Sequence, residues 1–204
     1  MLEAGCGTGG NLAMLARFGK LEAFELDEEA RAIAQTKQPI AVKYGMLPDG
    51  IPFSPGTFDV VTAFDVIEHV EQDLASLTML AQQLSPGGRL IMTVPALPWL
   101  WSSHDETHHH YRRYTRQSLL ATLRQAGLHP LRVSYFNTLL FPFIAGLRVL
   151  RKHLHLKETA DDAMPGAGMN AVLKAIFGAE SALIGRFNFP IGVSLMAVAE
   201  RPHE

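Results

Sequence analysis

The chain opens with the residues MLEAGCGTGG, numbered 1–10. A short apolar stretch runs directly into glycines at positions 5, 7, 9 and 10, and a helical pattern over residues 11–18 follows. Glycine adopts positive φ angles without steric cost and lets the backbone approach a ligand, and a helix N-terminus presents free N–H groups beside it. The segment therefore predicts a strand, a ligand-binding turn and a helix.

Further along the chain, short β-rich runs alternate with helical patterns. This alternation is typical of crossover units that build a parallel sheet. The predicted strands cover residues 1–4, 21–26, 40–44, 58–64, 89–94, 131–136 and 193–199, and the predicted helices cover residues 11–18, 28–36, 72–84, 116–126, 139–155 and 169–187. We expect a doubly wound α/β sheet in a single domain over residues 1–204.

Composition limits the class of protein and its partners. The chain has 204 residues, a net charge of -2 and one cysteine, so neither nucleic-acid binding nor an internal disulfide is expected. The first residues lack the pattern of a secretory signal, which predicts a cytoplasmic protein. The first strand is shorter than the usual five or six residues, so we expect a domain truncated at its N-terminus.

A helical insertion is predicted over about residues 138–188, before the last strand. The most apolar part, residues 138–150, is interrupted by Pro142, Gly146 and Arg148 and is too short to span a membrane. Its first helix carries apolar and basic residues, a pattern shared by lids over apolar pockets, peripheral membrane helices and dimer contacts. We rank a lid first, and the sequence leaves the oligomeric state undetermined.

The glycine turn leaves two classes of cofactor open. Gly5, Gly7 and Gly10 match the spacing of dinucleotide-binding turns, and Glu25 follows Gly5 by 20 residues, where an acid binds ribose hydroxyls. This much fits an NAD(P)-dependent oxidoreductase. However, Glu3 lies in the apolar strand just before the turn, where an acid suits a cationic amino-acid ligand better than a pyrophosphate.

Besides Glu3, later sequence motifs and the late strand at residues 193–199 favour S-adenosylmethionine (SAM). The stretch Phe58-Asp59-Val60-Val61, the stretch Glu68-His69-Val70 and the segment LSPGGRL at residues 84–90 resemble the later motifs of class I SAM-dependent methyltransferases. The resemblance extends from Leu2 to about Glu200 and is strongest up to Gly88. It implies a Rossmann-like sheet, mostly parallel, with an antiparallel last strand over residues 193–199.

The same resemblance implies how SAM binds. Glu3 and the turn contact the methionine part, Glu25 holds the ribose hydroxyls, and Leu26 lies against adenine. The chain departs from the family after the third strand, where Gly45-Met46-Leu47 replaces an aspartate that binds the adenine amino group. For Glu25 the alternative is a surface acid at a strand end. The full predicted cofactor set is Glu3, Gly5, Cys6, Gly7, Gly9, Glu25, Leu26, Met46, Leu47 and Phe64.

Acidic and imidazole side chains follow the fourth and fifth predicted strands. Asp65, Glu68 and His69 come after the fourth, at the carboxyl edge where ligands bind, and His69 is a candidate general base. Further on, the chain reads HHHYRRY at residues 108–114. A rival interpretation has Asp65 and Glu68 capping the next helix while the histidines occupy a polar loop.

This arrangement resembles that of metal-assisted methyltransferases of the ubiquinone pathway and of small-RNA 2′-O methylation. The resemblance implies that Asp65, Glu68, His69 and His110 are catalytic and bind a divalent metal ion, with Asp65 standing where relatives carry glutamate. Arg112, Arg113 and Arg116 form a basic patch suited to an anionic group on the acceptor or to a solvated helix start.

The predicted activity is methyl transfer from SAM to a small-molecule or lipid-like acceptor, at oxygen. A lipophilic acceptor would place the protein in peripheral contact with a membrane. Two alternatives remain at this point: an NAD(P)-dependent oxidoreductase, and a protein that binds SAM without turnover.

Overall fold

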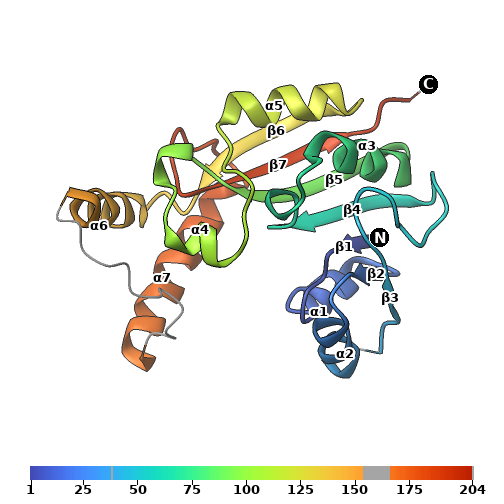
Figure 1. The fold of residues 1–204 in the computed structure, drawn as a ribbon, viewed down its shortest axis with the longest axis horizontal. Coiled ribbons are helices and arrows are strands. Elements are labelled where there is room, and N and C mark those ends of the chain that lie inside the picture. Colours follow the sequence, from blue (N-terminus) through green and yellow to red (C-terminus); the bar gives the residue numbers. More distant parts are fainter. Residues whose placement is uncertain (38, 154–165, 204) are drawn as a thin grey trace.

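The structure is a computed structural model that describes residues 1–37, 39–153 and 166–203. Seven strands form one sheet, with helices on its two faces and two long helices beyond one end (Figure 1). The strands are β1 (Leu2–Ala4), β2 (Glu22–Glu25), β3 (Val42–Tyr44), β4 (Phe58–Phe64), β5 (Leu84–Pro95), β6 (His129–Phe136) and β7 (Ser194–Glu200). The α-helices are α1 (Leu12–Leu15), α2 (Glu28–Lys37), α3 (Asp73–Gln83), α4 (Ser103–Thr107), α5 (Arg116–Gln125), α6 (Phe141–His153) and α7 (Ala167–Ile184). Three 3-10 helices are η1 (Ala16–Phe18), η2 (Ile67–His69) and η3 (Pro98–Leu100).

The strand order is β3-β2-β1-β4-β5-β7-β6. All strands run parallel except β7, which pairs antiparallel with both β5 and β6. The predicted doubly wound sheet with an antiparallel last strand is therefore confirmed. The chain leaves β1 toward β2 and β3 and returns to the other side of β1 as β4, so the carboxyl ends of β1 and β4 border the crevice in which such sheets bind ligands.

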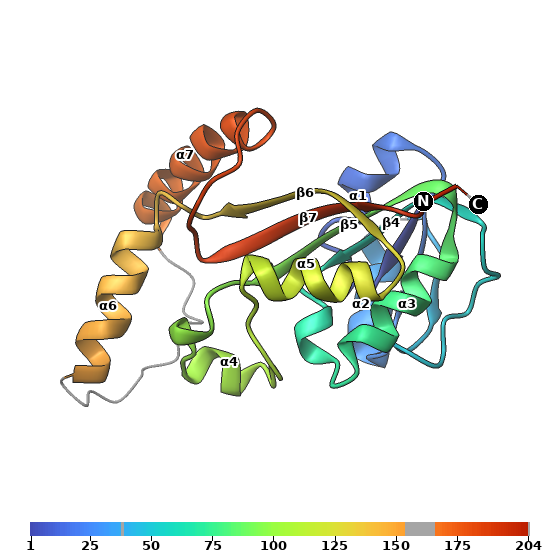
Figure 2. The ribbon, with the colours of Figure 1, turned by 90° about the horizontal axis from the view of Figure 1, so that it is seen from above.

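Two apolar layers hold the helices against the sheet. On one face, Leu77 and Leu80 of α3 and Leu119 and Leu123 of α5 are fully buried. On the other face, α1 and α2 pack over β1, β2 and β3 through a smaller cluster that includes Leu12 and Ala34. Figure 2 shows α1 on the opposite side of the sheet from α3 and α5. These contacts pack helices against both faces of β1 and so support the strand that leads into the glycine turn.

Some helices and strands begin or end at residues other than those predicted, because tertiary contacts lengthen them. Strand β5 begins at Leu84, five residues earlier than expected, because Leu84 pairs with Phe58 ahead of a register shift in β4. The short helix α4 was not predicted; a capping box between Ser102 and Asp105 starts it. The predicted helices 139–155 and 169–187 correspond to α6 and α7, and residues 154 and 155 lie outside the described residues.

Candidate cofactor and acceptor pockets

The glycine turn after β1 is shaped by backbone conformations that disfavour a side chain. Gly5 has a φ of +64°, and a Cβ atom built on it would lie 2.9 Å from Cγ2 of Val66. Gly7 has a φ of +52°, and its N–H donates to Oε2 of Glu25 over 2.7 Å. The turn is therefore tied to the end of β2 and leaves an open space between itself and the segment that follows β4.

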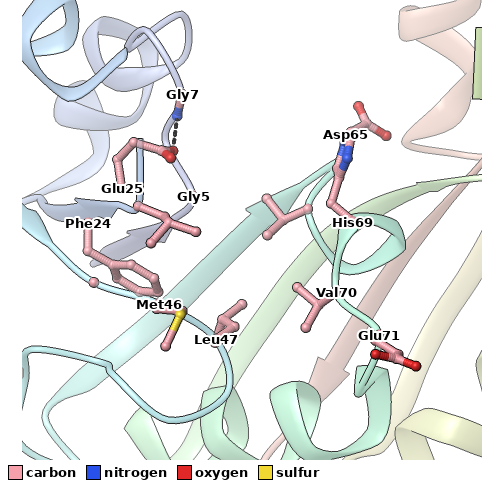
Figure 3. A pocket seen from close by; sticks show the side chains of 13 residues that line it. Gly5, Gly7, Phe24, Glu25, Met46, Leu47, Asp65, His69, Val70 and Glu71 are labelled. Atoms are coloured by element: carbon pink, nitrogen blue, oxygen red, sulfur yellow. Dashed lines mark hydrogen bonds between the residues drawn. The ribbon is translucent and has the colours of Figure 1, made fainter. Parts of the chain in front are cut away.

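That space is a pocket of about 420 Å³ at the carboxyl ends of β1, β2 and β4. Glu25 and Gly7 lie on one side of it, and Asp65 and His69 lie across from them (Figure 3). Six of the predicted cofactor residues meet here: Gly5, Gly7, Glu25, Leu26, Met46 and Leu47. The sequence analysis missed Phe24, Gly45, Val66, Val70 and Glu71, which also line the pocket.

An apolar wall occupies the end of the pocket near β2 and β3. Phe24, Met46 and Leu47 gather there (Figure 3). A Cβ atom on Gly45 would lie 2.8 Å from the Phe24 ring, so this glycine allows the chain after β3 to pass close to that ring. Such a wall suits an aromatic base held by apolar contact, which fits the missing aspartate in the Gly45-Met46-Leu47 segment.

The other four predicted cofactor residues do not line this pocket. Cys6 is buried beside α1, where burial, together with the charges of Glu3 and Glu25, raises the pKa of its thiol to about 12. Gly9 packs against Ala34 of α2. Phe64 packs against the same cluster on the far face of the sheet.

Glu3 is the fourth, and it lies buried in β1, before the turn. Its Oε1 accepts from Asn11 over 3.3 Å, whereas its Oε2 is buried and has no hydrogen-bond partner among the described residues. Burial raises the pKa of Glu3 to about 7. A buried carboxylate with an unused oxygen fits a cationic group such as the ammonium of a bound amino acid, since unpaired buried charges are costly.

A second, more polar pocket of about 350 Å³ adjoins the first. Asp65 and His69 line both pockets, so they stand at the junction. The remaining polar lining includes Glu68, His108 and His110 of the histidine segment, and His104 of α4. The two clusters that follow β4 and β5 therefore meet at one pocket, because the carboxyl ends of the two parallel strands share an edge of the sheet.

Three of these side chains form a compact cluster. One ligand atom from each of Glu68, His69 and His110 lies within 4.8 Å of the other two, and the rings of His69 and His110 are 4.6 Å apart between centroids. Asp65 is not among these three. Its φ of +53° is uncommon for a residue other than glycine, and its N–H donates to the backbone oxygen of Thr93.

Burial dominates the electrostatics of the cluster. It raises the pKa of Glu68 to about 8, with a further contribution from the Asp65 charge, and Oε2 of Glu68 has no hydrogen-bond partner among the described residues. Burial also lowers the pKa of His69, and the neighbouring His110 lowers it further. The lowered pKa favours the neutral form of the His69 ring, which is the form that can accept a proton.

The positions of these side chains bear on two alternatives from the sequence, namely helix capping by Asp65 and Glu68 and the role of the basic patch of Arg112, Arg113 and Arg116. The predicted next helix is α3, whose N-cap residue is Gln72 and which has no side-chain cap, so Asp65 and Glu68 do not cap it. The arginines of the basic patch are engaged within the protein. Arg112 donates to the carbonyls of Val70 and Glu71, and Arg116 donates to that of Val133.

The insertion reaches the second pocket through α6. Arg148 of α6 lines that pocket and donates to the carbonyl of Leu100, and the ring of Phe141 packs edge-on to Trp99 at 6.1 Å. Glu180 of α7 is buried and accepts from the N–H groups of Thr138 and Leu139 just before α6, which ties the two helices together. Among the described residues, no helix combines the length and hydrophobicity that crossing a bilayer requires.

Comparisons with known proteins identify the family of the chain. Residues 1–133 match the family described as methyltransferase domain. A ubiquinone biosynthesis O-methyltransferase of Xanthomonas euvesicatoria pv. vesicatoria is 29% identical over 147 residues, which cover 63% of this chain and 62% of that protein. The chain thus spans a little under two thirds of the length of this relative.

Solved structures share the fold. Geranyl diphosphate C-methyltransferase from Streptomyces coelicolor, in complex with Mg²⁺, geranyl diphosphate and S-adenosyl-L-homocysteine, has a TM-score of 0.66 at 16% identity and covers 98% of this chain and 70% of its own. A putative methyltransferase of Haloferax volcanii, solved with its Trm112 activator, has a TM-score of 0.65 at 17% identity and covers 100% of this chain and 82% of its own. The family match rules out the oxidoreductase alternative, and the chain belongs to the class I SAM-dependent methyltransferases.

Proposed function

We propose that this protein transfers a methyl group from SAM to a hydroxyl oxygen of a small-molecule acceptor. The observation that carries the proposal is the position of His69, which lines both the pocket assigned to the cofactor and the adjoining polar pocket. A neutral imidazole at that junction is suited to take the proton of an acceptor hydroxyl as the oxygen becomes a nucleophile.

The residues of the first pocket fit SAM. Glu25 stands where it would hold the ribose hydroxyls, and Phe24, Met46 and Leu47 would contact adenine. Glu3 does not line this pocket, but its buried Oε2, which has no hydrogen-bond partner among the described residues, lies in the strand just before the glycine turn and would suit the cationic amino-acid end. When bound, SAM supplies an electrophilic methyl group on its sulfonium. The protein then has to hold the acceptor in line with that methyl, exclude water and accept the hydroxyl proton.

Glu68, His69 and His110 fit a divalent metal ion, with Asp65 beside them. The fit rests on the buried, unpaired Oε2 of Glu68 and on the mixture of carboxylate and imidazole donors, which suits Mg²⁺, Mn²⁺, Fe²⁺ or Zn²⁺. A bound ion would lower the pKa of the acceptor hydroxyl. His69 would then act as a ligand, and the acceptor would lose its proton to solvent or to another group.

Removal of divalent ions by a chelator distinguishes a metal-dependent site from one in which His69 acts as the base without a metal ion. If a metal ion is required, we expect EDTA treatment followed by desalting to reduce turnover at least tenfold, and one of the four ions to restore it, since loss of a Lewis acid removes several kcal/mol of transition-state stabilisation. Turnover that is unchanged by EDTA would exclude the metal version and leave His69 as the base. Binding of S-adenosylhomocysteine, measured in parallel by calorimetry, serves as the control for an intact cofactor site.

We propose a lipophilic acceptor. Helix α6 borders the second pocket, and Leu139, Phe143 and Leu150 on or next to it are exposed. The sequence relative is a ubiquinone biosynthesis enzyme by name. An acceptor with an apolar tail could place its hydroxyl at His69 and its tail along α6, with peripheral membrane contact for a cytoplasmic protein.

A pair of phenolic acceptors tests both the reaction and this preference. We expect methyl transfer from labelled SAM to phenolic compounds, with a kcat/KM at least tenfold higher for those bearing a long alkyl chain, since each buried CH₂ contributes about 0.8 kcal/mol. Equal kcat/KM values would contradict the lipophilic preference. Binding of S-adenosylhomocysteine with no transfer to any acceptor would favour the non-catalytic alternative.

A further inference from the structure

Asp105 links the candidate site to its supporting structure. Its side chain is fully buried in α4, in the segment after β5. Its Oδ1 lies 2.9 Å from Nδ1 of His110 and accepts from Nε of Arg113 over 2.7 Å. Its Oδ2 accepts from the backbone N–H of Ser102 over 2.9 Å. Sequence analysis had assigned no role to this residue.

The charge on Asp105 determines which ring nitrogen of His110 carries the proton. The carboxylate forms a buried ion pair with Arg113, whose Nε lies 2.7 Å from Oδ1, and its Oδ2 accepts from the backbone N–H of Ser102, so both partners stabilise the ionised form. An ionised carboxylate only accepts hydrogen bonds. Nδ1 of His110 must therefore donate, and in the neutral ring Nε2 then carries a lone pair.

The lone pair matters because of what surrounds the ring. With Nδ1 engaged by Asp105, Nε2 is the nitrogen left for the cluster that His110 forms with Glu68 and His69. A histidine that presents a lone pair can bind a metal ion or accept a proton, whereas one that presents N–H can do neither. Histidine ligands are commonly held in this way by a carboxylate behind them.

We propose that Asp105, held in place by Arg113, is a positioning residue of the methyl-transfer site that fixes His110 as the Nδ1–H tautomer and presents Nε2 to Glu68 and His69. The catalytic meaning of this contact rests on the proposed function, while the tautomer itself does not. Arg113 anchors the carboxylate from behind, since its guanidinium is buried and also donates to the carbonyl of Ala96.

A purely structural role for Asp105 has to be separated from this one. The same carboxylate completes the capping box of α4, together with the side chain of Ser102. Ser102→Ala weakens that cap but leaves the backbone N–H of Ser102 and the Asp105–His110 contact in place. It is therefore the matched control for Asp105→Ala.

The tautomer can be read directly by ¹⁵N NMR of protein labelled on histidine, with the His110 signals assigned from a His110→Gln sample. At about pH 8.5, roughly two units above the reference imidazole pKa, we expect a protonated Nδ1 and an unprotonated Nε2 in the wild type and in Ser102→Ala. In Asp105→Ala we expect a shift toward protonated Nε2. A wild-type ring protonated at Nε2 would overturn the proposal, as would the same shift in Ser102→Ala or none in Asp105→Ala.

Kinetics give the second readout. We expect Asp105→Ala to lower kcat about 10- to 100-fold, the usual effect of removing a residue that orients a metal ligand, with the KM for SAM unchanged and Ser102→Ala close to wild type. An unchanged kcat in Asp105→Ala would overturn the catalytic part. If Asp105→Ala does not fold, the wild-type spectrum still tests the tautomer. Because the spectrum needs no turnover, failure of the proposed function and failure of this inference can be told apart.

Discussion

Replacing Glu25 with alanine is expected to weaken binding of S-adenosylhomocysteine by tenfold or more. Glu25 is the carboxylate at the end of β2 that lines the first pocket opposite His69. Each charge-assisted hydrogen bond to a ribose hydroxyl contributes about 1.5–3 kcal/mol, and 1.4 kcal/mol corresponds to a factor of ten. Titration calorimetry on the purified protein measures the change.

The Glu25 side chain has a second function that adds to the loss. Its two oxygens accept from the N–H groups of Gly7 and Asp27, over 2.7 and 2.9 Å, so the residue also holds the glycine turn. Each carboxylate oxygen has a further lone pair available for a ligand. Glu25→Gln, which keeps the size of the side chain but loses the charge, should lie between wild type and Glu25→Ala.

Glu22→Ala is the matched control for this experiment. Glu22 lies on the same strand, and its carboxylate contacts Lys20 and Lys43 at 3.7 Å, away from the pocket. Pairs of this exposed kind contribute about 1 kcal/mol or less. Its affinity should equal that of wild type. An unchanged affinity in Glu25→Ala, with a native circular dichroism spectrum, would remove Glu25 from the cofactor site.

The sheet was predictable because each strand carries its own local signal. Parallel strands buried on both faces give short apolar runs, and the intervening helices give a 3.6-residue pattern, so the alternation alone indicates a doubly wound fold. The ends of elements were less predictable. Leu84 joins β5 only because Phe58 lies beside it, and that contact joins residues 26 positions apart. No local pattern reports such a pairing.

The candidate site also combines residues that local sequence patterns predict with residues whose place only tertiary contacts reveal. Gly5, Gly7, Glu25 and His69 lie at or just after strand ends, and topology alone brings the carboxyl ends of parallel strands together. Phe24, by contrast, lies within β2, and its sequence pattern does not differ from that of a core residue. Its place in the pocket depends on Gly45, which allows the segment after β3 to pass close to its ring. The role proposed for Asp105 could not be predicted either, because its contact with His110 depends on the conformation of the segment after β5. A signal was present in Ser102-x-x-Asp105, a helix-capping pattern that places the carboxylate.

Replacing His69 with glutamine is expected to lower kcat about 100-fold or more, whichever role the ring has. A general base contributes about 10²–10⁴-fold. His129→Gln is the matched control, because His129 begins β6 opposite Glu200, at the other end of the strands from the pockets. A kcat within a factor of two of wild type for His69→Gln would rule out both roles.

The pH profile distinguishes the two roles of His69. Burial and the neighbouring His110 lower the pKa of His69 below its usual value, and a base acts in its neutral form. If His69 is the base, kcat/KM should be constant at neutral pH and fall as the pH drops through this lowered pKa, below about 6.5. His69→Gln should lose that acidic limb together with the rate. If His69 is instead a metal ligand, the variant should bind its ion more weakly, and added metal should restore part of the activity. If the site binds no ion and His69 is the base, added metal should leave the activity of His69→Gln unchanged.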